Sequence, residues 1–219
     1  MTPQPTIDGR TWFQIDGTLE AIDFDGPSYF RFPYELARIV IGRLSEPGDM
    51  VIDPFCGFGT ALVAAEDLDR RAVGIEKDAD RFGFASERVH EPNRVIHASA
   101  LDLDTLELPP ADLIFTSPPY TSFRDWDQAG FDTYWTDFDA VFAKLSGVLR
   151  ADGRLVVEVS NVREEDGRVR QVAFEAALRL GKWYEFLGEI VRCNTGAEKA
   201  GPGVDHAYLM VFRLRASHD

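Results

Sequence analysis

The five residues "TSPPY" (116–120) combine hydrogen-bond acceptors, a rigid turn and an aromatic ring. The Ser117 hydroxyl and the Pro118 carbonyl are hydrogen-bond acceptors, and the pair Pro118 and Pro119 adds no backbone donor while fixing the turn. The ring of Tyr120 can stack on a planar substrate. The four residues Ser117 to Tyr120 are therefore candidate catalytic residues. A Pro-Pro strand terminator with a packing tyrosine is the alternative.

The segment "DPFCGFGT" (53–60) has the composition of a ligand-binding loop between a strand and a helix. Gly57 and Gly59 permit a tight turn and let a ligand approach the backbone. A dinucleotide fingerprint would need glycine at Leu62, and the Lys-Ser/Thr pair of a phosphate-binding P-loop is missing. Glu76, at the end of the next predicted strand, can accept both hydroxyls of a ribose. These residues predict a nucleoside ligand without a pyrophosphate. A plain tight turn and a solvated acid at a strand end are the alternatives.

Composition and charge limit the class of protein. With 219 residues, 45% of them hydrophobic, the chain is expected to be one globular domain over 1–219. Its net charge of −14 argues against a protein that grips a nucleic-acid backbone unaided, although an acidic total can hide a local basic groove.

Other classes are disfavoured by what the sequence lacks. The two cysteines, Cys56 and Cys193, are far apart and the four histidines form no ligand-spaced cluster, so neither a disulfide framework nor a metal site is expected. No apolar run approaches the ~18 residues that span a bilayer, and the amino terminus has no signal-like apolar core, so a cytoplasmic protein without a membrane partner is expected.

The elements that must position the two motifs follow from periodicity. Strands alternate with helices, which indicates a parallel sheet covered on both faces. Helices are predicted at 34–44, 60–68, 78–89, 138–150 and 168–181. Strands are predicted at 50–53, 71–76, 94–98, 111–115 and 154–160, and an antiparallel hairpin at the edge of the sheet at 185–193 and 206–214. The carboxyl ends of adjacent parallel strands should bring 53–60 and 116–120 to one crevice.

Together, "FRFPYEL", "DPFCGFGT" and "LIFTSPPY" make the chain resemble the DNA amino-methyltransferases, which modify cytosine N4 or adenine N6 with S-adenosylmethionine. The resemblance covers most of 30–160, with weaker similarity at "HAYLMVFRL". It implies an α/β class I methyltransferase fold, a Rossmann-like doubly wound sheet of about seven strands. It also implies S-adenosylmethionine as cofactor, near Phe32, Pro33, Asp53, Pro54, Phe55, Cys56, Gly57, Gly59, Thr60, Glu76, Lys77 and Asp102.

The methyl acceptor is less well defined by the sequence. Neither the ~20 residues after Tyr120 nor the tail can hold a target-recognition domain of the usual ~100 residues, so none is expected and a separate recognition subunit would supply it. Candidate substrate-binding residues are aromatic, with core packing as the alternative: Phe123, Trp126, Tyr134 and Trp135. The loop 194–205 is either a lid or a plain connection. DNA is favoured as acceptor over RNA or a small planar amine, and a catalytically silent cofactor-binding subunit is disfavoured by the intact "SPPY".

Overall fold

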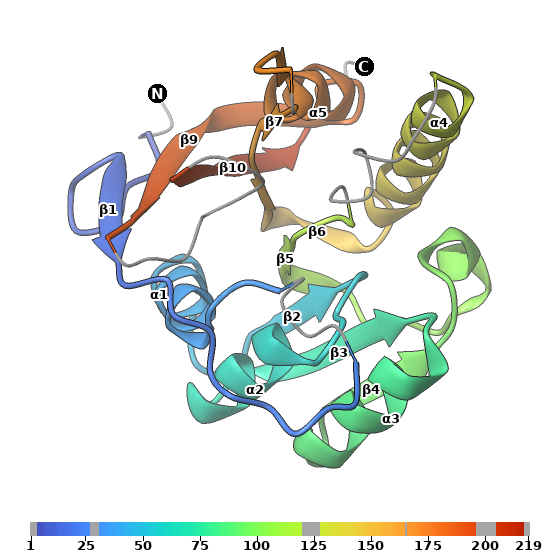
Figure 1. The fold of residues 1–219 in the computed structure, drawn as a ribbon. Coiled ribbons are helices and arrows are strands. Elements are labelled where there is room, and N and C mark those ends of the chain that lie inside the picture. The colour runs from blue at the N-terminus through green and yellow to red at the C-terminus, as the bar shows by residue number, and fades with distance from the viewer. Residues whose placement is uncertain (1–3, 27–30, 120–127, 165, 196–204, 217–219) are drawn as a thin grey trace.

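An eight-stranded mixed sheet with helices on both faces forms the body of the protein (Figure 1). The computed structural model describes residues 4–26, 31–119, 128–164, 166–195 and 205–216. In spatial order the strands are β1 (Trp12–Ile15), β9 (Tyr184–Asn194), β10 (His206–Leu214), β6 (Leu149–Val159), β5 (Ala111–Thr116), β2 (Met50–Asp53), β3 (Arg71–Glu76) and β4 (Arg94–His97). A separate two-stranded sheet pairs β7 (Val162–Arg163) with β8 (Val169–Arg170).

The predicted doubly wound topology is confirmed. β2 pairs with β3 on one side and with β5 on the other, all in parallel, so the order reverses between β2 and β5. β10 is antiparallel to both β6 and β9, as the predicted hairpin requires. The sheet has eight strands where about seven were expected, and one expectation was wrong, because the hairpin is not the edge of the sheet. The added strand β1 pairs in parallel with β9.

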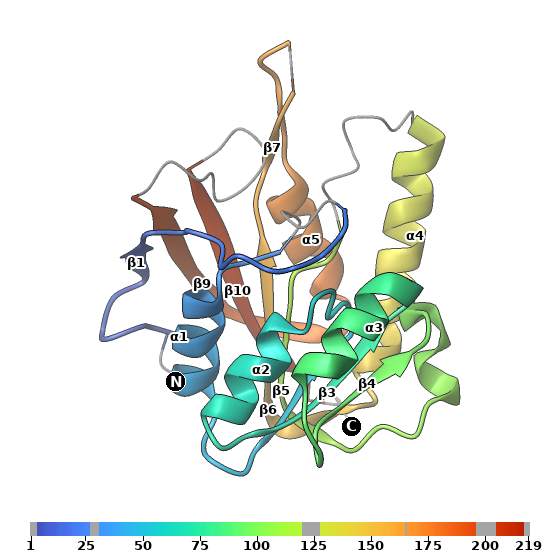
Figure 2. The same ribbon diagram turned by 60° about the horizontal axis from the view of Figure 1, so that its bottom comes forward.

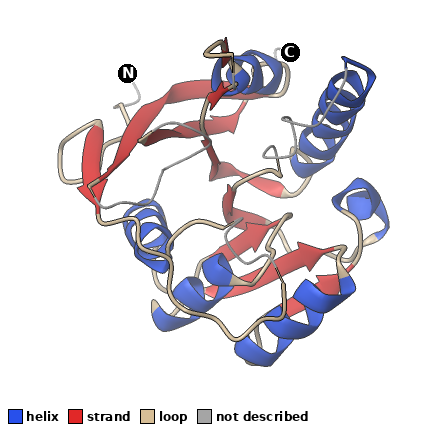
Figure 3. Ribbon diagram, viewed as in Figure 1, coloured by secondary structure: helices blue, strands red, loops and turns tan. Residues whose placement is uncertain are grey.

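Helices cover the two faces of the sheet in two groups (Figures 1 and 3). The first group is α1 (Tyr34–Leu44), α2 (Thr60–Asp67) and α3 (Ala79–Arg88), and the second is α4 (Gln128–Leu145), α5 (Val172–Leu180) and the 3-10 helix η1 (Ala100–Thr105). Side chains alternate along β5, so Leu113 and Phe115 join the core under the first group while Ile114 joins the core under the second. This double coverage explains why the central strands are apolar throughout.

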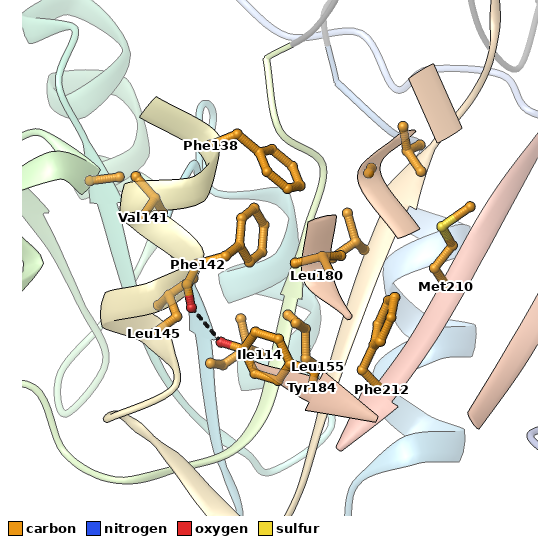
Figure 4. Packing of buried hydrophobic residues seen from close by; sticks show 14 of the residues in the cluster. Ile114, Phe138, Val141, Phe142, Leu145, Leu155, Leu180, Tyr184, Met210 and Phe212 are labelled. Atoms are coloured by element: carbon orange, nitrogen blue, oxygen red, sulfur yellow. Dashed lines mark hydrogen bonds between the residues drawn. The ribbon is translucent and has the colours of Figure 1, made fainter. Parts of the chain in front are cut away.

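Aromatic side chains extend α4 towards its amino terminus. The helix begins at residue 128 rather than 138, because Phe131, Trp135 and Phe138 continue its apolar stripe at helical spacing. Within the same core the Tyr184 hydroxyl donates to the Phe142 carbonyl at 2.8 Å, which ties β9 to α4 (Figure 4). The helix ends at Leu145 rather than at the predicted residue 150, so sequence periodicity placed this helix but neither of its ends.

Two further differences concern the second half of the chain. β6 begins at Leu149, five residues before the predicted strand, and α5 begins at Val172 because the preceding residues form β8. The loop predicted over 194–205 lies for most of its length outside the described residues. Among the helices that are described, none has both the length and the apolar character needed to cross a membrane.

Candidate active site

The two motif loops meet where the strand order reverses. β2 and β5 are neighbours, so their carboxyl ends carry the loop 53–60 and the turn 116–119 side by side. The Thr116 hydroxyl donates to Oδ1 of Asp53 at 2.6 Å, which joins the turn to the loop directly. The two motif loops therefore meet as the topology predicted, and Figure 2 shows β7 and the start of α4 projecting on this side of the sheet.

Asp53 is the buried residue that joins the loop 53–60 to the turn 116–119. Its side chain is 1% exposed, and Oδ1 also accepts from the backbone N–H of Phe55 at 3.0 Å. Burial raises the pKa of Asp53 to about 7, and the charge of Glu76 adds to this, while the hydrogen bonds from Thr116 and Phe55 oppose it. The carboxyl group therefore fixes the start of the loop and titrates near neutral pH.

Glu76 is fixed in place rather than solvated. It is 8% exposed at the end of β3, which excludes the alternative of a solvated strand-end acid. Its Oε2 accepts from the N–H of Gly57 at 2.9 Å and its Oε1 accepts from the N–H of Asp78 at 2.8 Å. Each carboxylate oxygen can accept a further hydrogen bond, so the group can still receive ligand hydroxyls.

The two glycines of the loop have different surroundings. Both have positive φ, +53° at Gly57 and +77° at Gly59, which glycine adopts without strain. A Cβ at Gly57 would meet no atom within 4 Å, whereas a Cβ at Gly59 would lie 3.3 Å from the Cβ of Ala85 in α3. The open space predicted beside both glycines is present only at Gly57, and Gly59 instead lets α3 pack close.

The rest of the loop is buried and shaped by its neighbours. Cys56 donates its N–H to Ile75 at 3.0 Å, and a Cβ at Gly74 would lie 2.7 Å from its Sγ, so β3 needs glycine there. Burial raises the pKa of the Cys56 thiol, which makes a thiolate role unfavourable. Pro54 is buried and Phe55 packs against the core under α4.

Thr60, at the start of α2, holds an unsatisfied polar atom. Its Oγ1 is buried and has no hydrogen-bond partner among the described residues. Buried hydroxyls are normally hydrogen-bonded, so this atom marks a place where a bound polar group would be favourable.

The remaining predicted cofactor residues lie around this loop in two settings. Phe32 and Pro33 are buried, and the Phe32 ring lies 4.9 Å from the Phe115 ring, which supports the turn from below. Lys77 and Asp102 follow β3 and β4 at the same edge of the sheet, and both side chains are exposed. These two residues therefore lie at the exposed edge of the candidate site, whereas Asp53 and Glu76 are buried in it.

The segment before α1 contributes a residue that sequence reasoning missed. Phe24 packs edge-on against Phe58 in the loop, with ring centroids 4.9 Å apart, and against Phe84 of α3 at 5.7 Å. Arg88 donates to the Phe58 carbonyl at 2.8 Å. The loop is thus packed against both α3 and Phe24. The segment around Phe24 is polar, so its sequence showed no helix or strand periodicity.

The turn 116–119 is supported by a second missed residue. The Ser117 hydroxyl donates to Oε2 of Glu158 at 2.8 Å. Ser117 is half-buried, Pro118 is buried and Pro119 is exposed. Glu158 lies in β6 and is itself buried, so the sign of its importance was available in the sequence: an acidic residue inside the apolar strand "RLVVEVS".

Two of the four predicted substrate-binding aromatic residues lie within the described residues. Tyr120 and two of the candidates lie outside the described residues: Phe123 and Trp126. The expectation that Trp135 lines a substrate pocket is wrong, because its side chain is 3% exposed and packs in the core against Phe138, with ring centroids 5.2 Å apart. Tyr134 is partly buried against the same core. Core packing explains these two rings.

A broad surface depression lies elsewhere, at the amino ends of β2, β3 and β4. It is lined by Met50, Arg71, Val73, Pro92, Arg94, Glu107, Leu108 and Pro109. Ligands of open α/β sheets bind at the carboxyl ends of the strands, so the place where the two motif loops meet is the better candidate site.

Comparison with known proteins finds related sequences over part of the chain. Residues 28–87 match the family model of the DNA methylases, described as N6_N4_Mtase. A type II methyltransferase, M.XycI, of Xanthomonas campestris pv. cyanopsidis is 40% identical over 70 residues, which are 32% of this chain and 23% of the relative. The type II methyltransferase M.SmaI of Serratia marcescens is 39% identical over 66 residues, 30% of this chain and 23% of the relative. The chain thus matches about a quarter of the length of these relatives.

Solved structures are similar in fold to this protein over most of its length, at low sequence identity. TrmN from Thermus thermophilus aligns with a TM-score of 0.62 at 18% identity, covering 83% of this chain and 49% of that one. The N-methyltransferase NodS from Bradyrhizobium japonicum WM9, in complex with S-adenosyl-L-homocysteine, aligns with a TM-score of 0.59 at 12% identity, covering 84% of this chain and 86% of that one. The protein therefore has the class I methyltransferase fold, and its residues 28–87 match the DNA methylase family model.

Proposed function

We propose that the protein is an S-adenosylmethionine-dependent N-methyltransferase that acts on an exocyclic nucleobase amine in DNA, cytosine N4 or adenine N6. The observation that carries this proposal is the hydrogen bond from Thr116 to Asp53, which joins the amine-holding turn to the nucleoside loop in one crevice. The DNA methylase match over residues 28–87 supports the choice of nucleobase amines among methyl acceptors.

The residues of the loop fit the cofactor. Gly57 faces open space, Glu76 presents a fixed carboxylate for the ribose hydroxyls, and Thr60 holds an unsatisfied hydroxyl. Phe32, Pro33, Phe55, Lys77 and Asp102 would complete the surroundings. When bound, the cofactor supplies an electrophilic methyl group on a sulfonium ion.

The turn handles the acceptor. Ser117 Oγ and the Pro118 carbonyl take the two N–H bonds of the amine, which localises its lone pair, and Tyr120 stacks on the base ring. In a duplex the base must first leave the helix to reach this crevice. Holding the amine in line for attack supplies most of the acceleration. No strong general base is needed, because a methylated ammonium nitrogen loses its proton readily to water.

The acidity of the chain bears on how DNA is held. With a net charge of −14, phosphate contacts from this chain alone are disfavoured, so a separate recognition subunit that supplies a basic surface is part of the proposal. RNA or a small planar amine remains the second candidate acceptor, since the same net charge favours a substrate without a long phosphate backbone.

The test is transfer of labelled methyl from S-adenosylmethionine to DNA, RNA and a metabolite extract, followed by digestion and identification of the product. We expect N4-methylcytosine or N6-methyladenine from DNA. Label found only in RNA or in small molecules would replace DNA by the second candidate. Absence of label in all three, from protein that binds the cofactor, would contradict the enzyme assignment and favour a silent cofactor-binding subunit.

A further inference from the structure

We propose that Glu158 and Arg192 are positioning residues that fix the direction of the Ser117 hydroxyl hydrogen, so that Ser117 can only accept from the substrate amine. The inference rests on the proposed function, in which Ser117 takes one N–H of that amine. It adds two residues from β6 and β9 that neither motif contains.

The contacts form a short buried chain. Ser117 Oγ donates to Oε2 of Glu158 at 2.8 Å, and Nη2 of Arg192 donates to Oε1 of the same carboxylate at 2.8 Å. The side chains of Arg192 and Glu158 are 3% and 4% exposed. Both oxygens of the carboxylate are therefore engaged, one by the catalytic turn and one by a permanent cation.

The sheet register explains how residues on separate strands reach each other. β10 lies between β6 and β9, and on it Leu209 is opposite Glu158 while Ala207 is opposite Arg192. Opposite residues share a face, so Arg192 must cross β10 on the face that carries Ala207 and Leu209. The small Ala207 leaves room for the arginine stem.

A second hydrogen bond, from the other terminal nitrogen of the guanidinium, also fixes Arg192. Its Nη1 donates to Oδ1 of Asn194 at 2.8 Å. A Cβ at Gly17 would lie 2.2 Å from Nδ2 of Asn194, so the chain after β1 needs glycine to accommodate this amide. The eighth strand, which sequence reasoning missed, thereby helps to hold the guanidinium in place.

The chemistry of the three groups fixes the direction of each hydrogen bond. Arginine has only donors and a carboxylate has only acceptors, so Glu158 must receive from both neighbours. The hydroxyl hydrogen of Ser117 then points towards β6, and only its lone pairs remain for the substrate. Donation to an anion also makes the hydroxyl oxygen a better acceptor.

The stability of the folded protein alone does not explain why Glu158 and Arg192 form a buried ion pair. Apolar residues of similar volume are often as stabilising as a buried ion pair, because both charges lose their hydration. The two charges lie on a face otherwise lined by apolar side chains, including Ile190 and Leu209. The hydrogen bond between Glu158 and Ser117 is the feature that an apolar pair could not reproduce.

The test is a double-mutant cycle between Glu158 and Ser117, read by single-turnover methyl transfer. In Glu158→Gln, Arg192 binds the amide oxygen and the amide NH₂ faces Ser117, so the hydroxyl no longer has an obligatory acceptor. We expect kcat to fall about tenfold or more, the range for loss of a hydrogen bond to a charged group, with the cofactor Kd unchanged. In a Ser117→Ala background the same change should have little further effect.

Two companion variants keep the test decisive. Glu185→Gln disrupts the ion pair with Arg213 on the same hairpin, away from the turn, and should transfer methyl at the native rate. If Glu158→Gln does not fold, Glu158→Gln with Arg192→Met removes the carboxylate without leaving a lone buried charge, and it should show the same loss of kcat.

The outcomes separate this inference from the proposed function. Native kcat in a folded Glu158 variant, or losses that add in full to that of Ser117→Ala, would overturn the positioning role while leaving the enzyme assignment intact. A wild-type protein that transfers no methyl to DNA, RNA or metabolites would overturn the proposed function, and the positioning role with it.

Discussion

Replacing Gly57 by alanine tests whether the open space beside the loop is the cofactor site. Gly57 has φ +53° and a Cβ there meets no atom within 4 Å, so the free protein should lose only the cost of a left-handed alanine, about 1–2 kcal/mol. For a chain of this size that is a fall in Tm of roughly 2–8 °C. A methyl group in the ligand's space should cost about 1–3 kcal/mol of binding, or about 5- to 150-fold in Kd.

Gly59→Ala is the matched control, because it has the same kind of backbone strain in the same loop. Its Cβ would press on Ala85 of α3 at 3.3 Å, so we expect the larger loss of stability but the smaller loss of affinity. Calorimetric titration with S-adenosylhomocysteine and thermal unfolding measure the two effects separately. Unchanged affinity in folded Gly57→Ala, or a greater affinity loss in Gly59→Ala, would refute the placement of the ligand over Gly57.

Two further predictions concern the buried carboxylates. Because burial raises the pKa of Asp53 from 3.8 to about 7, the folded state keeps this proton to higher pH than the unfolded chain, so the free energy of unfolding should fall between about pH 4 and pH 7, by up to about 4 kcal/mol. Asp53→Asn should flatten that slope in denaturant titrations, and an unaltered slope would contradict the assignment. Glu76→Ala should weaken cofactor binding by roughly 1.5–3 kcal/mol and also destabilise the free protein by about 1–3 kcal/mol, because the N–H groups of Gly57 and Asp78 lose their acceptors. Glu76→Gln should retain most of the stability, and a native Tm in Glu76→Ala would show that these hydrogen bonds matter little.

Sequence analysis correctly predicted the features that depend on residues close together in the chain. The alternation of strands and helices, the boundaries of β2 and β3, and the meeting of the two motif loops all follow from periodicity and glycine chemistry near each element. β1 was missed because its partner β9 is about 180 residues away in sequence, as the pairing Ile15 with Asn194 shows.

The supporting residues of the site depend on contacts between distant strands. Glu158 and Arg192 were not predicted: the acid inside an apolar strand was visible in the sequence, but only the register of β6, β10 and β9 places Arg192 near it. Trp135 was assigned to a pocket because a cluster of aromatic residues has the same composition whether it lines a cleft or packs a core. Burial distinguishes these cases, and burial is a property of the folded chain.

Single-turnover methyl transfer by Ser117→Ala, with cofactor affinity measured on the same sample, tests the central claim most directly. The account predicts an unchanged cofactor Kd and a rate lower by about 100-fold, similar to the loss of one preorganised hydrogen-bonding group in other active sites. Transfer at the native rate would contradict it, because the turn at 116–120 would then be structural and the amine would be activated elsewhere.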